Sequence, residues 1–411
     1  MCPVRNVTYV SGRSPIAPYA TVDGAKPGGW GYTAATKVRE DALNFDFSDD
    51  QKMLRDQARR FLDDRGAVGR ARGLLDAGGG FDKELWAEMA ALGWQGAALP
   101  EEYGGAGLSY LDLCVIAEEL GRANAAVPFA SSVYLASEAI ARFGSDEQKR
   151  AWLPALASGE VVGTLAAGEG TGPLTPARVQ AEVANGGLSG DKSPVNDGGD
   201  ADIVVVVARG GSGHGLFLVE TAGAGVTRTA LQMTDASRPA VSITFDSAAA
   251  DPLPVEDGWA ALQELYDRAA VLYAFEQVGG AQRCLEMARD YACERFAFGR
   301  PIGSFQAIKH KLADIYIATE LARSNAYYGA WALNANAPEL PVAAATARVA
   351  ACRAYDLAAK ENIQTHGGMG FTWELDCHLY YRRAKELGLA LGAARTWKDK
   401  LVARLETRNA A

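Results

Sequence analysis

The order of periodic patterns along the chain constrains its fold more than any single motif does. From Ser48 onward, Leu54, Ala58 and Phe61 recur at the three- and four-residue spacing of an amphipathic helix. Residues 161–255 instead carry short β-branched runs separated by Gly, Asn and Asp, which is typical of strands and turns. Helical periods return over 259–408. A β-module between two helical segments is unusual, because most large enzymes alternate strands with helices or separate them once.

This order predicts an α+β multidomain protein with an N-terminal helical domain, a middle β-barrel-like domain and a C-terminal four-helix bundle. We expect the domains to span 45–160, 161–255 and 256–411. Residues 1–44 are rich in Gly, Pro, Ser and Thr, which favours an extension that is flexible or draped over a neighbour. The predicted helices include 82–92, 109–121, 131–143 and 146–157, the predicted strands include 203–207, 216–219 and 241–245, and breaks in the last domain fall at 299–303, 334–341 and 367–370.

Charge and cysteine usage exclude several classes of function. The net charge is -9, and Lys and Arg are scattered, so we expect no nucleic acid partner. No apolar run of about 18 residues and no secretory profile is present, which predicts a cytoplasmic protein without a membrane segment. The six cysteines occur singly and histidines are few, so we expect neither disulfides nor a metal site.

Two motifs in the last segment combine basic, aromatic and glycine residues. The first is the string Glu294-Arg295-Phe296-Ala297-Phe298-Gly299-Arg300-Pro301-Ile302-Gly303-Ser304-Phe305-Gln306. The second is Gln364-Thr365-His366-Gly367-Gly368-Met369-Gly370-Phe371. An arginine fork can bond pyrophosphate oxygens in pairs, and glycines let backbone approach a phosphate-bearing cofactor closely. Both motifs therefore favour a nucleotide cofactor.

With these strings, the turn Leu99-Pro100-Glu101-Glu102-Tyr103-Gly104-Gly105 and the stretch from Lys192 to Arg209, the chain resembles the acyl-CoA dehydrogenases over about 45–408. The resemblance implies FAD as cofactor and an acyl-CoA as substrate. It also implies that the cofactor is shared between subunits, as a homodimer, a homotetramer or a heterotetramer with a related chain. The cofactor-binding positions that it implies are Arg295, Phe298, Phe305, Gln306, Gln364, Gly367, Gly368 and, in the β-domain, Asn196.

The resemblance further implies α,β-dehydrogenation of an acyl-CoA thioester, in which a glutamate removes the α-proton while a hydride leaves for flavin N5. The two positions where the family carries that glutamate fall on Leu391 and Ala269, and neither side chain accepts a proton. Glu276 lies about 10 Å along the helix from Ala269, and Glu386 is about a third of a turn off the Leu391 face. Both offsets are large for a substitute base, and a glutamate at such a place is more commonly a solvated or ion-paired helix residue.

Three interpretations stay open at this point. The base has moved to Glu276 or Glu386, or the chain is a base-less half-site subunit whose related partner carries the glutamate, or the fold serves other flavin chemistry. Arg268 and Asp267 are the candidate substrate-binding residues that the resemblance implies. Arg268 lies near Ala270, where relatives place a CoA-binding arginine, and Asp267 matches a family acidic residue near the CoA moiety. Asp267 could also serve a helix dipole.

Overall fold

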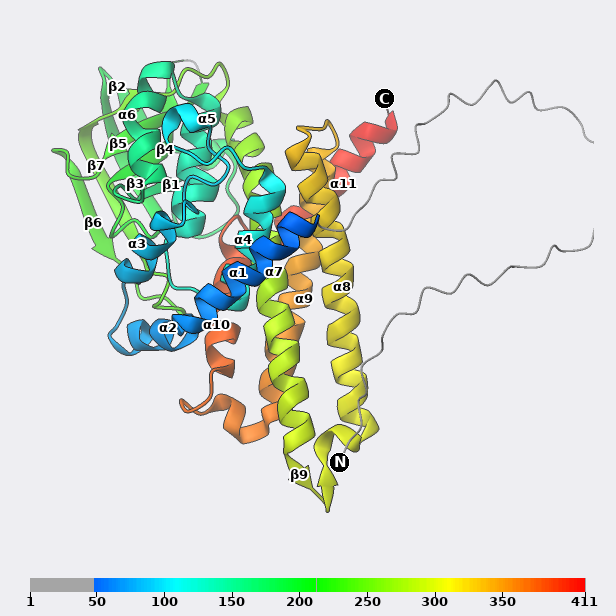
Figure 1. The fold of residues 1–411 in the computed structure, drawn as a ribbon. Helices are drawn as coiled ribbons and strands as arrows, with labels where there is room; N and C mark the ends of the chain where they lie inside the picture. Colours follow the sequence, from blue (N-terminus) through cyan, green and yellow to red (C-terminus); the bar gives the residue numbers. More distant parts are fainter. Residues whose placement is uncertain (1–47, 212, 411) are drawn as a thin grey trace, which may run out of the picture. The chain divides into compact units, whose positions relative to one another are not determined.

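A computed structural model describes residues 48–211 and 213–410. The predicted extension 1–44 lies outside these residues. Phe45–Ala411 form one compact unit, so the predicted division at 160/161 and 255/256 stays a prediction. The order of helices, then strands, then helices agrees with the sequence pattern (Figure 1). No helix among the described residues is both long and apolar enough to cross a membrane.

The first segment is a group of short helices joined by tight turns. Capping boxes begin three of them, because Ser48, Ser109 and Ser145 each accept a backbone N–H while the residue three positions later bonds back. The predicted helix 131–143 is real, but its first half has π-helical hydrogen bonding. The elements are α1 (Asp49–Asp64), α2 (Ala67–Asp76), α3 (Lys83–Ala91), η1 (Glu101–Tyr103), α4 (Tyr110–Arg122), η2 (Ala130–Ser137), α5 (Glu138–Phe143) and α6 (Asp146–Ala157).

The middle segment folds as one mixed eight-stranded sheet. Its strands follow the order β6-β7-β3-β2-β4-β5-β8, with β1 pairing in parallel with β4. Alternate apolar residues of β4 and β7 pack into a core separate from that of the helices. The strands are β1 (Gly163–Ala166), β2 (Glu182–Ala184), β3 (Gly187–Asn196), β4 (Ile203–Gly210), β5 (Gly213–Glu220), β6 (Val226–Ala230), β7 (Ala240–Ala249) and β8 (Asp251–Pro252), and η3 (Pro176–Arg178) precedes β2.

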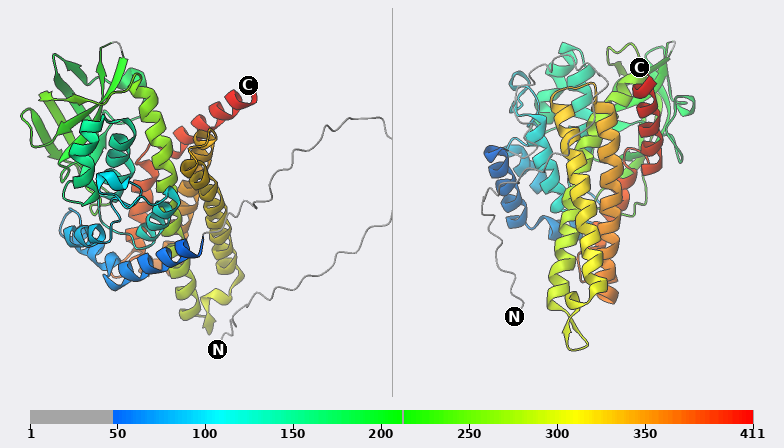
Figure 2. Two further views of the ribbon diagram at one scale, coloured as in Figure 1. Left: turned by 45° about the horizontal axis from the view of Figure 1, so that its top comes forward. Right: turned by 90° about the vertical axis from the view of Figure 1, so that its right-hand side faces the viewer.

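The last segment is built on three long helices, α7 (Gly258–Glu294), α8 (Gln306–Asn334) and α9 (Leu340–His366), which run side by side (Figure 2). They approach closely because small residues line the contacts. A Cβ at Gly280 of α7 would lie 2.4 Å from the Tyr355 ring of α9. Shorter elements complete the segment: the strands β9 (Phe296–Ala297) and β10 (Arg300–Pro301), then η4 (Ile302–Ser304), η5 (Gly367–Phe371), α10 (Cys377–Leu389) and α11 (Ala394–Ala410).

Candidate functional site

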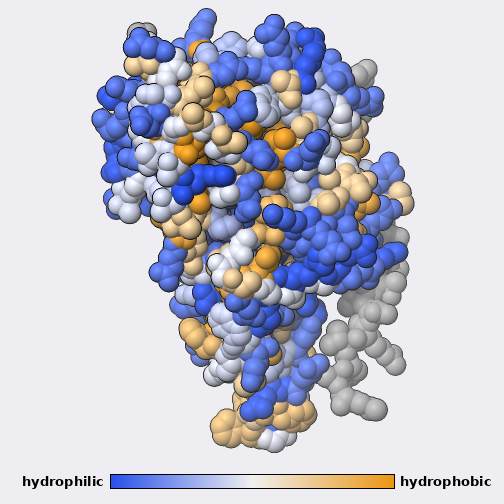
Figure 3. All heavy atoms as spheres, turned by 90° about the vertical axis from the view of Figure 1, so that its left-hand side faces the viewer, coloured by the Kyte–Doolittle hydropathy of each residue, from blue (hydrophilic) through white to orange (hydrophobic). Residues whose placement is uncertain are grey.

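The hairpin between α7 and α8 carries the first group of predicted cofactor residues. Strands β9 and β10 pair antiparallel, with Arg300 opposite Ala297, and Gly299 turns the chain with a positive φ of 77°. Phe298 is 95% exposed at the tip and itself adopts a φ of 52°, a conformation that side chains other than glycine rarely take. In Figure 3 the hairpin forms the lower end of the molecule and is coloured as apolar. An exposed aromatic ring on a strained backbone is suited to stacking against a partner.

Basic and aromatic side chains surround this tip. Arg300 lies over the Phe305 ring at 4.1 Å, and Phe305 packs edge-on against Phe298 at 6.1 Å between centroids. The side chains of Arg295 and Gln306 are exposed beside them. The hairpin therefore presents two guanidinium groups and an aromatic pair to its surroundings.

The glycine turn that follows α9 lies at the same end of the three long helices (Figure 1). His366 links the two segments, because its ring stacks on Tyr291 of α7 at 4.2 Å while Nδ1 lies 2.9 Å from the Asn362 carbonyl oxygen. This agrees with a packing role for His366. No described atom lies within 4 Å of a Cβ built at Gly367 or Gly368, so their backbone faces open space. We call residues 295–306 together with 364–371 the hairpin end.

The remaining predicted cofactor residue, Asn196, lies elsewhere. It ends β3, after a register shift at which Pro194 lacks a backbone donor. Its amide donates to Glu386 of α10 across 3.3 Å. The structure therefore groups Asn196 with one of the two candidate carboxylates, and away from the hairpin end.

Glu386 and the other candidate carboxylate belong to one buried group, which we call the Arg238 cluster. Arg238 Nη1 lies 3.4 Å from Glu276 Oε1, and Arg238 Nε lies 3.7 Å from Asp197 Oδ2. The three segments of the chain all contribute to the cluster. Ser131 of η2 belongs to the first segment and donates to Asp197 of the middle segment, and Glu276 belongs to α7 of the last segment. The members of the Arg238 cluster are Ser131, Asn196, Asp197, Asp235, Arg238, Glu276, Arg383 and Glu386.

A second ion pair extends the cluster toward the N-terminal helices. Arg383 Nε donates to Asp235 across 2.7 Å, and the other guanidinium nitrogens donate to Ala125 O at 3.0 Å and Ser237 Oγ at 3.1 Å. Arg383 is 1% exposed, so these bonds replace its water shell. The arginine ties the β-sheet to both helical segments.

Burial controls the protonation of the cluster. It raises the pKa of the Glu386 carboxyl to about 7, although the guanidinium groups of Arg238 and Arg383 lower it. Burial also raises the pKa of Asp197, again against the effect of Arg238. Burial opposes the shift at Asp235, but Arg383, the Ser237 hydroxyl and Arg238 together outweigh it and lower the pKa of that carboxyl. Burial therefore keeps the proton on Glu386 to a higher pH than is usual for a carboxyl group.

Several polar atoms of the cluster have no hydrogen-bond partner among the described residues. Glu386 Oε2, Asp197 Oδ1, and Nε and Nη2 of Arg238 are buried in this state, as is the nearby Tyr134 hydroxyl. Burying such atoms without a partner is costly, so they indicate room for water or for a polar ligand group.

The two positions expected to carry a base are inert. Leu391 is 3% exposed, and its carbonyl accepts a bond from the Trp397 indole at 3.0 Å. Ala269 is fully buried in the core of α7. The two candidate substrate-binding residues form ion pairs with other residues of the chain. Asp267 pairs with Arg404 at 2.8 Å, and Arg268 pairs with Glu138 at 2.5 Å.

Asp267 and Arg268 form these ion pairs within the chain, and their expected role in binding a CoA chain stays a prediction. Arg268 also donates to Asn336 at 3.2 Å and lies over the Tyr110 ring at 4.8 Å. Burial raises the pKa of Asp267 to about 6, against the effect of Arg404. Arg268 is paired with Glu138 and Asp267 Oδ2 with Arg404, whereas Asp267 Oδ1 is buried without a hydrogen-bond partner among the described residues.

Sequence reasoning missed Arg238, Asp235 and Arg383 as buried charges. The available signal was weak: Arg238 directly precedes the apolar run that begins β7, and a charge at such a place is commonly solvated. The role of Glu169 in the loop before β2 was not predicted either. Glu169 accepts hydrogen bonds from Lys192 at 2.6 Å and from the backbone N–H groups of Gln180 and Ala181. These three hydrogen bonds to Glu169 fix the conformation of the loop.

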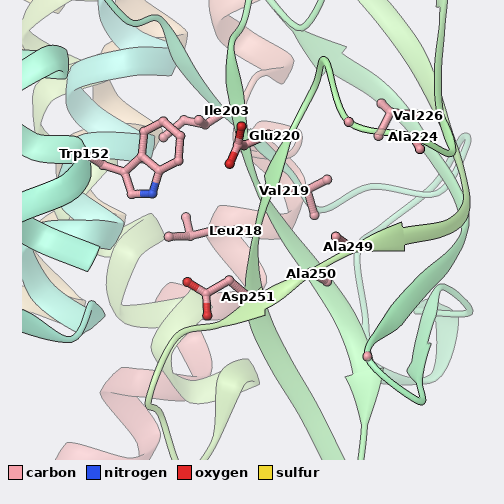
Figure 4. A pocket seen from close by; sticks show the side chains of 12 residues that line it. Trp152, Ile203, Leu218, Val219, Glu220, Ala224, Val226, Ala249, Ala250 and Asp251 are labelled. Carbon is pink, nitrogen blue, oxygen red and sulfur yellow. The ribbon is translucent and has the colours of Figure 1, made fainter. Parts of the chain in front are cut away.

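The sheet carries a separate concavity of about 500 Å³ (Figure 4). Its apolar lining includes Trp152, Ile203 and Leu218, and Glu220 and Asp251 also line it. None of the predicted site residues lines it. Gln148 already donates to Asp251 across 2.7 Å.

Two family models match the chain: "Acyl-CoA dehydrogenase, N-terminal domain" over residues 48–160 and "Acyl-CoA dehydrogenase, C-terminal domain" over residues 256–405. Acyl-CoA dehydrogenase IpdE2 of Mycobacterium tuberculosis is 32% identical over 82% of this chain and 91% of its own length. Acyl-CoA dehydrogenase FadE27 of the same organism is 35% identical, over 76% and 86%. The crystal structure of the ChsE4-ChsE5 complex from Mycobacterium tuberculosis superposes with a TM-score of 0.82 and 31% identity, over 89% of this chain and 99% of that chain.

Proposed function

Because this chain belongs to the acyl-CoA dehydrogenase family, a family of FAD-dependent oxidoreductases, we propose that it is the base-lacking subunit of a hetero-oligomeric acyl-CoA dehydrogenase. The observation that carries this proposal is the buried, apolar character of both base positions, Leu391 and Ala269. Replacing a proton acceptor by a hydrocarbon removes general-base catalysis at that position. In this account, a related partner chain supplies the glutamate.

The residues of the hairpin end suit an FAD group. The exposed guanidinium groups of Arg295 and Arg300 offer paired donors for a diphosphate, and Phe298 offers a ring for stacking. Gly367 and Gly368 leave space where a Cβ would otherwise stand, so a phosphate-bearing ligand can approach their backbone. Since this end projects outward, we propose that it grips FAD held mainly by the neighbouring subunit.

FAD, when bound, accepts the hydride that leaves the acyl β-carbon. This chain then has to bind and orient the cofactor and keep the assembly folded, without removing the α-proton itself. The Arg238 cluster serves the second task, since it joins all three segments through buried charges. The similar structure of the ChsE4-ChsE5 complex is, by its name, a complex of two different chains. This supports the proposal that the present chain also assembles with a different, related chain.

One observation favours a second candidate, in which this chain dehydrogenates the thioester with a relocated base. Glu386 has one carboxylate oxygen without a partner, and its pKa of about 7 is suitable for a general base at neutral pH. Glu276 is a weaker candidate, because Arg238 holds it across 3.4 Å. In this second account the chain is active as a homodimer or homotetramer.

Purification of the chain alone, followed by measurement of flavin absorbance per chain, separates the two candidates. The base-lacking account predicts a colourless or partly loaded protein, and no anaerobic bleaching by any acyl-CoA in a chain-length series. Co-expression with a related dehydrogenase subunit encoded nearby should restore both FAD and bleaching. Full FAD loading together with rapid bleaching of the chain alone would overturn this account.

Two substitutions then test the relocated base. If bleaching occurs with the chain alone, Glu386→Gln and Glu276→Gln are compared with Glu374→Gln, a matched change at an exposed glutamate. A base would lose at least about 10²-fold in bleaching rate on loss of its carboxylate. An unchanged rate in both buried variants would remove Glu386 and Glu276 from consideration.

A further inference from the structure

The last helix, α11, is held against the bundle by a small group of side chains. It packs against α9 (Figure 1), and its Trp397 is fully buried. Its Arg404 pairs with Asp267 of α7 at 2.8 Å and donates to the Pro341 carbonyl oxygen at 2.6 Å. Apart from Trp397, no described side chain of α11 is buried. The anchoring side chains of α11 therefore gather in one place, and Lys400 lies among them.

Lys400 is enclosed by two aromatic rings. Its Nζ lies 4.6 Å from the centroid of the Trp397 ring and 5.6 Å from that of the Tyr266 ring on α7. The side chain is half-buried, so the amine has lost part of its water shell but is still open to a reagent. Asp267 gives Oδ2 to Arg404 and keeps Oδ1 buried without a partner, so it forms no ion pair with Lys400.

The charged groups around Lys400 weaken its hold on a proton. Burial lowers the pKa of Lys400 to about 8, the Asp267 carboxylate opposes this shift, and the Arg404 guanidinium adds to it. Glu264 acts in turn on Asp267, whose pKa burial raises. Lys400 therefore becomes a neutral, nucleophilic amine at a lower pH than an ordinary lysine does.

Lys400 differs from the buried and the paired lysines of the chain. Burial also lowers the pKa of Lys192, but that side chain is 0% exposed and donates to Glu169 at 2.6 Å. Lys311 and Lys385 are paired with the carboxylates of Glu361 and Asp356. Lys400 is partly exposed and has no such partner, so its amine is available for a reaction.

We propose that Lys400 is an acylation site, at which the chain takes an acyl group from an acyl-CoA thioester. The neutral amine attacks the thioester carbonyl carbon, so an amide N–C bond forms and the C–S bond breaks. The proton that the nitrogen loses converts the departing CoA thiolate to the thiol, and no oxidant or further reagent takes part. Acylation removes the positive charge beside Asp267 and between the two rings.

This reaction uses neither FAD nor a catalytic glutamate, so it does not depend on the proposed function. Acetyl-CoA separates the two in an experiment, because an acetyl group has no β-carbon and cannot be dehydrogenated. Acetyl transfer to the chain therefore reports on Lys400 alone, whichever chain carries the base. Its failure and the failure of the proposed function are distinguishable.

Peptide mass spectrometry of the full chain after incubation with acetyl-CoA tests the site. At about pH 8, Lys400 should be acetylated at least about tenfold faster than Lys398, an exposed lysine on the same helix. The rate at Lys400 should level off above about pH 8, whereas the rate at an ordinary exposed lysine rises up to about pH 10. In denaturing urea the two rates should become equal, because the enclosure is lost. Equal rates in the folded chain, or a preference for Lys400 that persists in urea, would overturn the proposal.

Changes at two carboxylates give an independent readout. Asp267→Asn removes the charge that raises the pKa of Lys400, so the pH of half-maximal acetylation at Lys400 should fall. Asp399→Asn is the matched control, because Asp399 is an exposed carboxylate next to Lys400 in the sequence, and it should leave this pH unchanged. No shift in Asp267→Asn, or an equal shift in both variants, would contradict the proposal.

Discussion

The hairpin end and the Arg238 cluster use the same kinds of side chain in opposite states. At the hairpin end, Arg295 and Phe298 are exposed, and Phe298 reaches 95%. In the cluster, Arg238 and Arg383 are 2% and 1% exposed and are paired with carboxylates. An exposed guanidinium can still bind a ligand, whereas a buried pair is already used in holding the fold. The comparison teaches that burial decides which charged group is available for function.

The largest effect is expected from Arg238→Ala, which tests whether the buried arginines hold the fold. The change leaves Glu276 and Asp197 buried without their cation, so we expect the free energy of unfolding to fall by about 3–5 kcal/mol. Chemical denaturation measures it. Arg289→Ala, an exposed arginine whose neighbour is Asp290, should change it by less than about 0.5 kcal/mol. A loss below about 1 kcal/mol for Arg238→Ala would mean that the cluster is not structural.

A smaller effect is expected from the pH dependence of Glu386. Its pKa in the folded chain is about 7, above the ordinary value of 4.5, so the folded chain binds this proton more tightly than the unfolded chain does. Stability from this group is therefore complete below pH 4.5 and is lost as the pH rises toward 7 and beyond. The loss amounts to at most about 3.5 kcal/mol, since the pKa differs by about 2.5 units and one unit corresponds to about 1.4 kcal/mol.

Glu386→Gln isolates this contribution. Between pH 5 and 8 the denaturation midpoint of this variant should fall less steeply than that of Glu374→Gln, because Glu374→Gln keeps the Glu386 carboxyl. The wild-type chain should lose stability over the same range. Identical pH profiles for the two variants would show that Glu386 carries no unusual proton affinity.

Local and motif-encoded features could be predicted from the sequence. The capping serine Ser48 and the strand run at 203–207 are specified by neighbouring residues, and both were found. The partners of Arg238, Asp267 and Arg268 could not be found, because each lies at least 38 residues away along the chain. Periodicity reports which face of a helix is buried, but it does not report which charge from another segment meets it.

The same limit explains the outcome for the base. Counting along the helices identified Leu391 and Ala269, and the structure buries both. Counting along the helices did not reveal that Glu276 and Glu386 belong to one cluster. Their proximity depends on how α7, α10 and the loop before β7 pack together. The hairpin end was easier to anticipate, since its residues are contiguous within two short strings.

The most direct test of the account is Arg295→Ala in this chain, assembled with an unaltered partner. We expect the FAD dissociation constant of the assembly, measured by flavin titration, to rise about 10- to 100-fold, since one charge-assisted contact contributes about 1.5–3 kcal/mol. The denaturation midpoint of the chain alone should stay unchanged, because Arg295 is exposed. An unchanged FAD affinity, or a loss of stability that accounts for the weaker binding, would contradict the claim that the hairpin end grips the flavin nucleotide.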